Sequence, residues 1–265
     1  MCKVSVILPT HNAENTIDRC INSIINQTYT DWEIICCDDC STDGTLNKLH
    51  QWQGKDSRIT VIENTRNSRA GFSRNRCFEV AKGEYLAQID DDDYCAANRL
   101  EEQVKFLEDH PEIGFVGANA YLFDEHGIWG TFNVVEKPEK EDFISNSCFI
   151  NPSIMLRKTA IDIVGGYRIS KETRRSEDYD MFMRMYAAGI KGYNIQKQLV
   201  YYYRGEKSFP KCKYEFRVDE AKVRYKNFKE LGLLPKNSLF VVKPLIVGLI
   251  PIKIIEKIKK MKNSK

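Results

Sequence analysis

Short apolar runs alternate with stretches of helical periodicity between residues 3 and 110, and this alternation restricts the fold more than any other feature. The runs are rich in β-branched residues and end at proline or acidic residues, as buried strands do. They are KVSVILP at 3–9, WEIICCDD at 32–39, RITVIE at 58–63 and EYLAQID at 84–90. Helices are predicted near 17–25, 45–52, 73–81 and 100–107. This order predicts an α/β fold with a doubly wound, mostly parallel sheet.

Polar clusters follow three of these strands. PTHNAE comes at the end of the first strand, DDCSTDGT at the end of the second and DDDD at the end of the fourth. The carboxyl ends of parallel strands meet along one edge of a sheet, and doubly wound proteins bind their ligands there. Three loops that converge on this edge predict a functional site.

The pattern changes near residue 114, where shorter segments with aromatic side chains begin. Gly165 and Gly166 predict a turn, and a helix is expected between Ser176, a good N-cap residue, and Gly189. We expect one domain over residues 1–206, in which residues 114–206 form a smaller, mixed portion.

Charge and cysteine content exclude several classes of protein. A net charge of +3 on 265 residues argues against a dedicated nucleic-acid binder. Three of the nine cysteines cluster at Cys36, Cys37 and Cys40, without a second pair at zinc spacing. We interpret them as small buried hydrophobic side chains. Because no basic and then apolar leader follows Met1, a reducing cytoplasmic location is expected.

Four consecutive aspartates at 90–93 follow the fourth strand. A solvated polar turn is one interpretation, since aspartate is a poor strand former. The position of Asp90 at the end of a buried strand favours another. In extended backbone, side chains two positions apart share a face, so Asp90 and Asp92 can meet one divalent cation. Such cations take one or two carboxylates and leave their other positions to water and phosphates, which predicts a metal–diphosphate site.

The first two polar loops lack the standard nucleotide fingerprints, because neither GxxxxGK[ST] nor GxGxxG is present. Thr10 and Asn12 stand beside a helix start and suit nucleotide contacts. Asp39 can accept a hydrogen bond from a base or a ribose. Helix capping by Ser41 or Asp43 is the simpler role of the second loop, and it does not exclude ligand binding.

The segment RRSEDYD at 174–180 also allows two interpretations. Acids in the first turn of a helix stabilise it through the helix dipole. Alternatively, Asp178 faces the cleft as a general base, with Arg174 and Arg175 near a phosphate. The four histidines form no metal-like or triad-like group and are expected at the surface or in loops. The absence of GxSxG disfavours a serine hydrolase.

Taken together, residues 2–206 resemble family 2 inverting glycosyltransferases with the GT-A fold. The motifs that carry the resemblance are VSVILPTHN, SIINQTYTDWEIICCDDCSTDGT, GFSRNRCFEVAKGEYLAQIDDDDY, NPSIMLRK, VGGYR and SEDYDMFMRM, in this order. The later part looks most like bacterial enzymes that build exopolysaccharide, capsule or O-antigen. The resemblance implies a nucleotide-binding half, residues 1–113, and an acceptor-binding half, residues 114–206.

The resemblance also implies roles for individual residues. Asp39 would bind uracil and Asp91 would lie near the ribose. Asp90 and Asp92 would form a D-x-D motif for Mg²⁺ or Mn²⁺, with Asp92 as the direct ligand. The residues lining the nucleotide pocket would be Thr10, Asn12, Glu14, Asp39 and Asp91.

On the acceptor side, the resemblance implies that Asp178 is the catalytic base, with Arg174, Arg175 and Glu177 as phosphate or acceptor contacts. One base and one displacement would invert the anomeric carbon, so that an α-linked UDP-sugar gives a β-glycoside. Glu206 departs from the family pattern, because many relatives carry a histidine there. We assign Glu206 no role.

Beyond residue 206 a helical, basic and apolar segment is expected, residues 207–265. Its last 27 residues are too short and too interrupted, by Lys243, Pro244 and Pro251, to predict a membrane-spanning helix. They fit an interfacial segment on the anionic inner leaflet, which suits a lipid-diphosphate or glycan acceptor. The alternative is a helix packed on the catalytic domain or on the second subunit of a homodimer.

The expected function is transfer of a sugar from a nucleotide sugar, UDP-linked, to an acceptor hydroxyl in bacterial surface-polysaccharide assembly. A non-catalytic GT-A-like binding partner is the alternative, and the retention of Asp90, Asp92 and Asp178 favours the enzyme. A sugar nucleotidyltransferase is disfavoured, because no glycine-rich basic loop follows the first strand.

Overall fold

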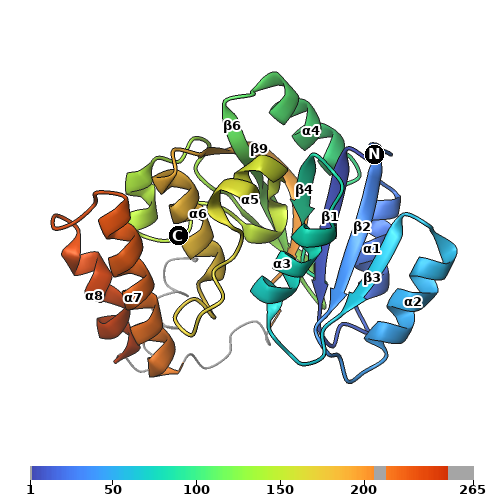
Figure 1. Cartoon of the computed structure of the whole chain (residues 1–265), viewed down its shortest axis with the longest axis horizontal. Helices are drawn as coiled ribbons and strands as arrows, with labels where there is room; N and C mark the ends of the chain where they lie inside the picture. The colour runs from blue at the N-terminus through green and yellow to red at the C-terminus, as the bar shows by residue number, and fades with distance from the viewer. Residues whose placement is uncertain (1, 206–212, 250–265) are drawn as a thin grey trace.

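The computed structural model describes residues 2–205 and 213–249, and in this part of the chain one sheet carries helices on both faces (Figure 1). The strands are β1 (Val4–Thr10), β2 (Trp32–Asp38), β3 (Ile59–Glu63), β4 (Tyr85–Gln88), β5 (Tyr94–Cys95), β6 (Ile113–Asp124), β7 (Gly127–Phe132), β8 (Met155–Arg157) and β9 (Lys191–Tyr203). The α-helices are α1 (Ile17–Ile25), α2 (Thr45–Lys55), α3 (Ala70–Val80), α4 (Arg99–Asp109), α5 (Lys158–Val164), α6 (Glu177–Ala187), α7 (Tyr214–Glu230) and α8 (Ser238–Gly248). Two short 3₁₀ turns are η1 (Lys140–Ile144) and η2 (Asn151–Ser153).

The strand order is β3-β2-β1-β4-β8-β6-β9-β5, with β7 paired to β6. The first four strands are parallel, whereas β8 runs antiparallel to both β4 and β6. The chain leaves β3 and crosses β1 to form β4 on its other side, so the strand order reverses at β1. A crevice forms at such a switch point, at the carboxyl ends of β1 and β4. The expected doubly wound sheet with a mixed second portion is confirmed.

Two hydrophobic clusters cover the two faces of the sheet. Along β1, Val4, Val6 and Leu8 contact the cluster that includes α1 and α4, while Ile7 contacts the cluster that includes α3 and α6. Successive side chains of a strand point to opposite faces, and both faces are covered here. The strand therefore appears in the sequence as a continuous apolar run.

The two glycine turns expected in the second half are present. Helix α5 ends at Gly165 in the left-handed conformation, with φ +73°. Helix α6 begins after Ser176 and ends two residues before Gly189, where φ is +78°. Glu177 and Asp178 therefore lie in the first turn of α6, as expected.

Some expectations need correction or lie outside the description. Cys36 and Cys37 are buried as expected, but Cys40 is exposed in the loop after β2. Glu206 and residues 250–265 lie outside the described ranges. Helix α8 packs on α7, and no helix in the described ranges is long and apolar enough to cross a membrane. The division at residue 206 stays a prediction.

Candidate active site

A cavity of about 810 Å³ opens at the carboxyl ends of β1 and β4, at the switch point of the sheet. Its walls come from the loops after β1, β2 and β4, the start of α3, the η2 turn, the start of α6 and the end of β9. Of the residues predicted for the site, the following line it: Thr10, Asp39, Asp90, Asp91, Asp92, Arg174, Arg175, Glu177 and Asp178. The fold thus gathers most of the predicted set around one cavity.

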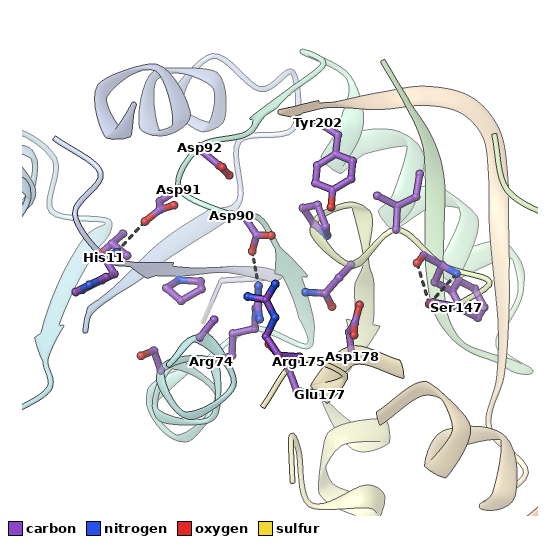
Figure 2. A pocket seen from close by; sticks show the side chains of 18 of the residues that line it. His11, Arg74, Asp90, Asp91, Asp92, Ser147, Arg175, Glu177, Asp178 and Tyr202 are labelled. Carbon is purple, nitrogen blue, oxygen red and sulfur yellow. Dashed lines mark hydrogen bonds and ion pairs between the residues drawn. The ribbon is translucent and has the colours of Figure 1, made fainter. Parts of the chain in front are cut away.

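The aspartates at 90–93 form a turn and not an extended segment. Strand β4 ends at Gln88, and the Asp93 backbone N–H donates to the carbonyl of Asp90 at 3.1 Å. Asp90 and Asp92 therefore do not share a face of an extended backbone, and this part of the prediction is wrong. In Figure 2 the carboxylates point in different directions: that of Asp90 points toward Arg74, and that of Asp91 points toward His11.

Asp90 forms an ion pair with Arg74, a buried arginine on α3. The Arg74 guanidinium also lies 5.5 Å from the centre of the Tyr167 ring. Within the described residues the Asp92 carboxylate forms no ion pair. Burial, together with the charge of Asp90, raises the pKa of Asp92 to about 6, although the charges of Arg19 and Arg204 lower this pKa in part. A cation would therefore stabilise Asp92 more than Asp90.

The other two aspartates of the turn are held by backbone donors. Asp91 accepts a hydrogen bond from the His11 N–H at 2.8 Å, and burial raises its pKa to about 7. Asp93, which had no predicted role, is fully buried and accepts from the Tyr203 N–H at 2.7 Å. Asp93 thus ties the turn to the end of β9.

The donor set fits Mg²⁺ or Mn²⁺ bound through a single protein carboxylate, that of Asp92. Such ions commonly use one or two carboxylates and complete their coordination with water and substrate phosphates. Across the described ranges, no group of three or more His, Cys, Asp or Glu side chains could hold a metal ion by itself. Substrate oxygens would therefore have to supply the other ligands.

Asn12 and Glu14 do not line this cavity, contrary to prediction. The Asn12 side-chain oxygen accepts from the Thr42 N–H at 2.8 Å, and Glu14 accepts from the Gly44 N–H at 3.0 Å. The Asn12 amide oxygen and one Glu14 carboxylate oxygen, which the prediction places against a nucleotide, are therefore bonded to the backbone of the neighbouring loop. Both residues fasten the loop after β2 to the loop after β1.

Asp39 lines the cavity and is buried at the end of β2. Its carboxylate accepts from the Asn64 side-chain amide at 2.7 Å, and from the N–H groups of Ser68 at 2.8 Å and Arg69 at 2.6 Å. Asp39 therefore holds the loop that leads into α3 in place. Its predicted contact with uracil stays a prediction.

Asp178 lies across the cavity from the acidic turn, in the first turn of α6 (Figure 2). Burial raises the pKa of Asp178, and Arg74 opposes this shift in part. Burial and the nearby charge of Asp178 raise the pKa of Glu177. A carboxylate with a raised pKa beside a cavity suits proton transfer. The segment 174–180 therefore has both predicted roles: it contains the start of α6, and it forms part of the cavity wall.

The two arginines before α6 differ in their partners. Arg174 forms ion pairs with Asp219 at 2.8 Å and Glu215 at 3.2 Å, both on α7. Arg175 is exposed and makes no ion pair within the described residues, although it lies 5.7 Å from the Phe216 ring centre. Arg175 is therefore the freer of the two to meet a phosphate.

Several residues that the sequence does not predict for the site also line the cavity, among them His11, Arg74, Tyr202 and Arg204. For Arg74 a signal was present, because it lies three positions after Gly71 and three before Cys77, in register with the buried face of α3. A charged residue in that register requires a buried partner. His11, expected to be a loop residue without a role in the site, gave no local signal.

An acidic turn at the switch point and a half-buried carboxylate across the same cavity match the site that the sequence resemblance implies. The family model for glycosyl transferase family 2 matches residues 5–169, and the chain belongs to this family.

Curated relatives and solved structures agree with this assignment. The chain is 37% identical over 250 residues to the putative glycosyltransferase EpsE of Bacillus subtilis, covering 94% of this chain and 90% of the relative. It is 32% identical to the UDP-Glc:alpha-D-GlcNAc-diphosphoundecaprenol beta-1,3-glucosyltransferase WfaP of Escherichia coli, covering 86% and 82%. The structure of Staphylococcus aureus TarS with UDP-GlcNAc superposes with a TM-score of 0.71 at 21% identity, covering 93% and 71%. The predicted GT-A fold is thereby confirmed.

Proposed function

We propose that this glycosyltransferase moves a sugar from a UDP-sugar to a hydroxyl of a phosphate-linked glycan in bacterial surface-polysaccharide assembly. The observation that carries the proposal is the position of Asp178 on one wall of the cavity and of the acidic turn on the other (Figure 2). The name of the WfaP relative, which specifies UDP-Glc and a diphosphoundecaprenol-linked acceptor, supports both substrate classes.

Asp178 would act as the general base. Its carboxylate takes the proton of the acceptor hydroxyl, whose oxygen forms a bond to the anomeric carbon of the donor. The bond from that carbon to the nucleotide diphosphate breaks on the opposite face, and the bonding electrons leave with the diphosphate. One displacement inverts the anomeric carbon, so an α-linked donor gives a β-glycoside. Burial keeps the basicity of Asp178 above that of an ordinary aspartate.

The acidic turn and the arginines would handle the donor diphosphate. Asp92 would hold Mg²⁺ or Mn²⁺, which when bound neutralises charge on the departing diphosphate. A solved mannosyltransferase from Pyrobaculum calidifontis contains GDP-Man and Mn²⁺, which supports a divalent ion here. Asp90 forms an ion pair with Arg74 and would orient the guanidinium of that arginine toward the cavity. Arg175 would contact a phosphate oxygen.

The nucleotide would occupy the part of the cavity between β1 and β2. Thr10, Asp39 and Asp91 line the cavity and come from the carboxyl ends of β1, β2 and β4. Asp39 would accept from the uracil ring and Asp91 would lie beside the ribose, as the sequence resemblance implies. Asn12 and Glu14 would act indirectly by holding the loop that carries Asp39.

We also propose a cytoplasmic enzyme that contacts the inner leaflet through its C-terminal region. Helix α8 leaves several apolar side chains exposed, and the sequence after it is rich in lysine. Contact with the leaflet would bring the enzyme to a lipid-linked acceptor. A homodimer through the same face is the alternative occupant.

The test is a transfer assay with UDP-, GDP- and TDP-sugars, Mn²⁺ and a diphosphate-linked sugar acceptor. We expect transfer from a UDP-sugar with inverted product, and a rate about 10²–10⁴-fold lower for Asp178→Asn. The matched control is Asp162→Asn, an exposed residue on α5 outside the cavity, which should leave the rate unchanged. If Asp178→Asn transferred sugar as fast as the unaltered enzyme, the assigned base would be wrong.

A further inference from the structure

A second cavity, of about 280 Å³, adjoins the catalytic one. The two cavities share Arg174 and Glu177 in their walls, so they meet at the start of α6. A molecule that places one group beside Asp178 can therefore extend another group into the second cavity. The donor needs no such extension, because its diphosphate and nucleotide lie toward β1 and β2 in the proposed function.

The charges around the second cavity are predominantly positive. Arg168 and Arg174 are matched by buried acids, Asp180 at 2.9 Å and Asp219 at 2.8 Å. Two further cations in the wall, Arg69 and Lys171, form no ion pair among the residues that the structure describes. Glu177 is the one acid in the lining. Two unpaired cations in one cavity favour an anionic ligand.

The segments that carry these two cations are held by hydrogen bonds. The Arg69 backbone N–H donates to the Asp39 carboxylate at 2.6 Å. Arg69 directly precedes α3 and has φ +74°. In the segment of Lys171, the buried Thr173 hydroxyl donates to the Arg168 carbonyl at 2.5 Å. The cavity is therefore shaped by ordered backbone, and the side chains of Arg69 and Lys171 are exposed at its edge.

The edge of the cavity also has apolar surface. Ile169 is 54% exposed and Phe72 is half-buried, and both line the cavity. Cationic side chains beside exposed apolar ones suit a phosphate group that continues into a hydrocarbon or a carbon chain. A free sugar hydroxyl would gain little from this combination.

We propose that the second cavity binds a phosphate group of the acceptor, with Arg69 and Lys171 as its cationic contacts. The acceptor sugar then lies at Asp178, and the phosphate that links this sugar to its carrier lies in the second cavity. The inference rests on the proposed function and extends it by naming two acceptor-binding residues. The phosphate can belong to a lipid diphosphate or to a phosphate-containing polymer, and the shared chemistry is the phosphate itself.

The test compares synthetic acceptors that carry the same sugar on a neutral alkyl glycoside, an alkyl monophosphate or an alkyl diphosphate. We expect the neutral glycoside to have the highest KM. In Arg69→Gln/Lys171→Gln, the KM for the phosphate-bearing acceptors should rise about tenfold, while the KM for the neutral one and for the donor stays unchanged. The matched control is Arg66→Gln, which removes an exposed cation from the same loop but outside both cavities.

Three outcomes would overturn the inference: equal KM for all acceptors with the unaltered enzyme, no change in the double variant, or the same loss with every acceptor. A larger effect on the diphosphate than on the monophosphate would identify a lipid-diphosphate type of acceptor, and equal effects would identify a single phosphate. If the unaltered enzyme transferred sugar to none of them while hydrolysing no UDP-sugar, the proposed function itself would fail.

Discussion

At the scale of single residues, the raised pKa of Asp178 should appear in the pH dependence of the rate. A general base works only when it is ionised, so activity should fall as the pH drops through its pKa. Burial raises that pKa. The acid limb of kcat/KM at saturating Mn²⁺ should therefore lie above pH 4, the ordinary range of aspartate. Asp178→Glu should keep an acid limb, whereas the residual rate of Asp178→Asn should lack it. A limb at or below pH 4 in the unaltered enzyme would contradict the assignment.

The unequal surroundings of Asp90 and Asp92 lead to a second prediction. EDTA should abolish transfer, and added Mn²⁺ should restore it. Asp92→Asn should raise the Mn²⁺ concentration for half-maximal activity about a hundredfold, because it removes the carboxylate that forms no ion pair within the described residues. Asp90→Asn should raise this Mn²⁺ concentration less, because the Asp90 carboxylate already pairs with Arg74. The measurement is a Mn²⁺ titration of each variant. Equal shifts, or full activity in EDTA, would refute the distinction.

At the scale of elements, α6 is fixed by Asp180, which is fully buried. Its carboxylate pairs with Arg168, in the segment between α5 and α6, and with Arg184 on α6 itself, and it accepts from Asn227 of α7 at 2.9 Å. Asp180→Asn should lower the free energy of unfolding by about 3–5 kcal/mol, because two arginines lose their counter-charge. Urea denaturation would measure this. Asp109→Asn, which breaks an exposed pair with Lys105, is the control and should leave the free energy of unfolding almost unchanged.

The elements also show how far the sequence alone could lead. The buried strands and the helix faces are local patterns, so β1, β2, β4, α1 and α6 were predictable. Contacts between distant segments were not. The bond from Tyr203 to Asp93 joins residues 110 positions apart. Likewise, the pairing of β6 with β9 has no signature in either strand. The turn at 90–93 is not predictable for the same reason, since β9 and Arg74, which stabilise it, are distant in the sequence.

Among the predicted site residues, some are placed by the topology of the sheet, whereas others depend on hydrogen bonds between loops. Asp39, Asp90 and Asp178 stand directly at element ends, and topology brings element ends together. Asn12 and Glu14 stand at an element end too, but their side chains meet the neighbouring loop before they reach the cavity. Which of two polar side chains in a loop faces a ligand depends on that loop's own hydrogen bonds. The sequence pattern does not contain this information.

At the scale of the whole molecule, the two most exposed of the large apolar side chains in the described ranges lie on α8 and directly after it. Leu239 is 79% exposed and Leu249 is 73% exposed, and Val242 and Ile246 on α8 are also exposed. Residues 250–265 then contain six lysines and one glutamate. Apolar side chains followed by lysines bind anionic lipid surfaces, where each lysine adds roughly 1 kcal/mol. The enzyme should therefore bind vesicles at the end of the molecule that carries α8, opposite β3 (Figure 1).

Sedimentation with vesicles tests this. The full chain should pellet with phosphatidylglycerol vesicles at low salt and not with phosphatidylcholine vesicles, and binding should weaken as salt screens the lysines. Leu239→Ser/Ile246→Ser should reduce the pelleted fraction severalfold, because each change removes exposed apolar area. Ile163→Ser, which removes an exposed isoleucine from α5, is the matched control and should pellet like the unaltered chain. If the full chain stayed in the supernatant at low salt and sedimented as a dimer, α8 would instead bind a second copy of the enzyme.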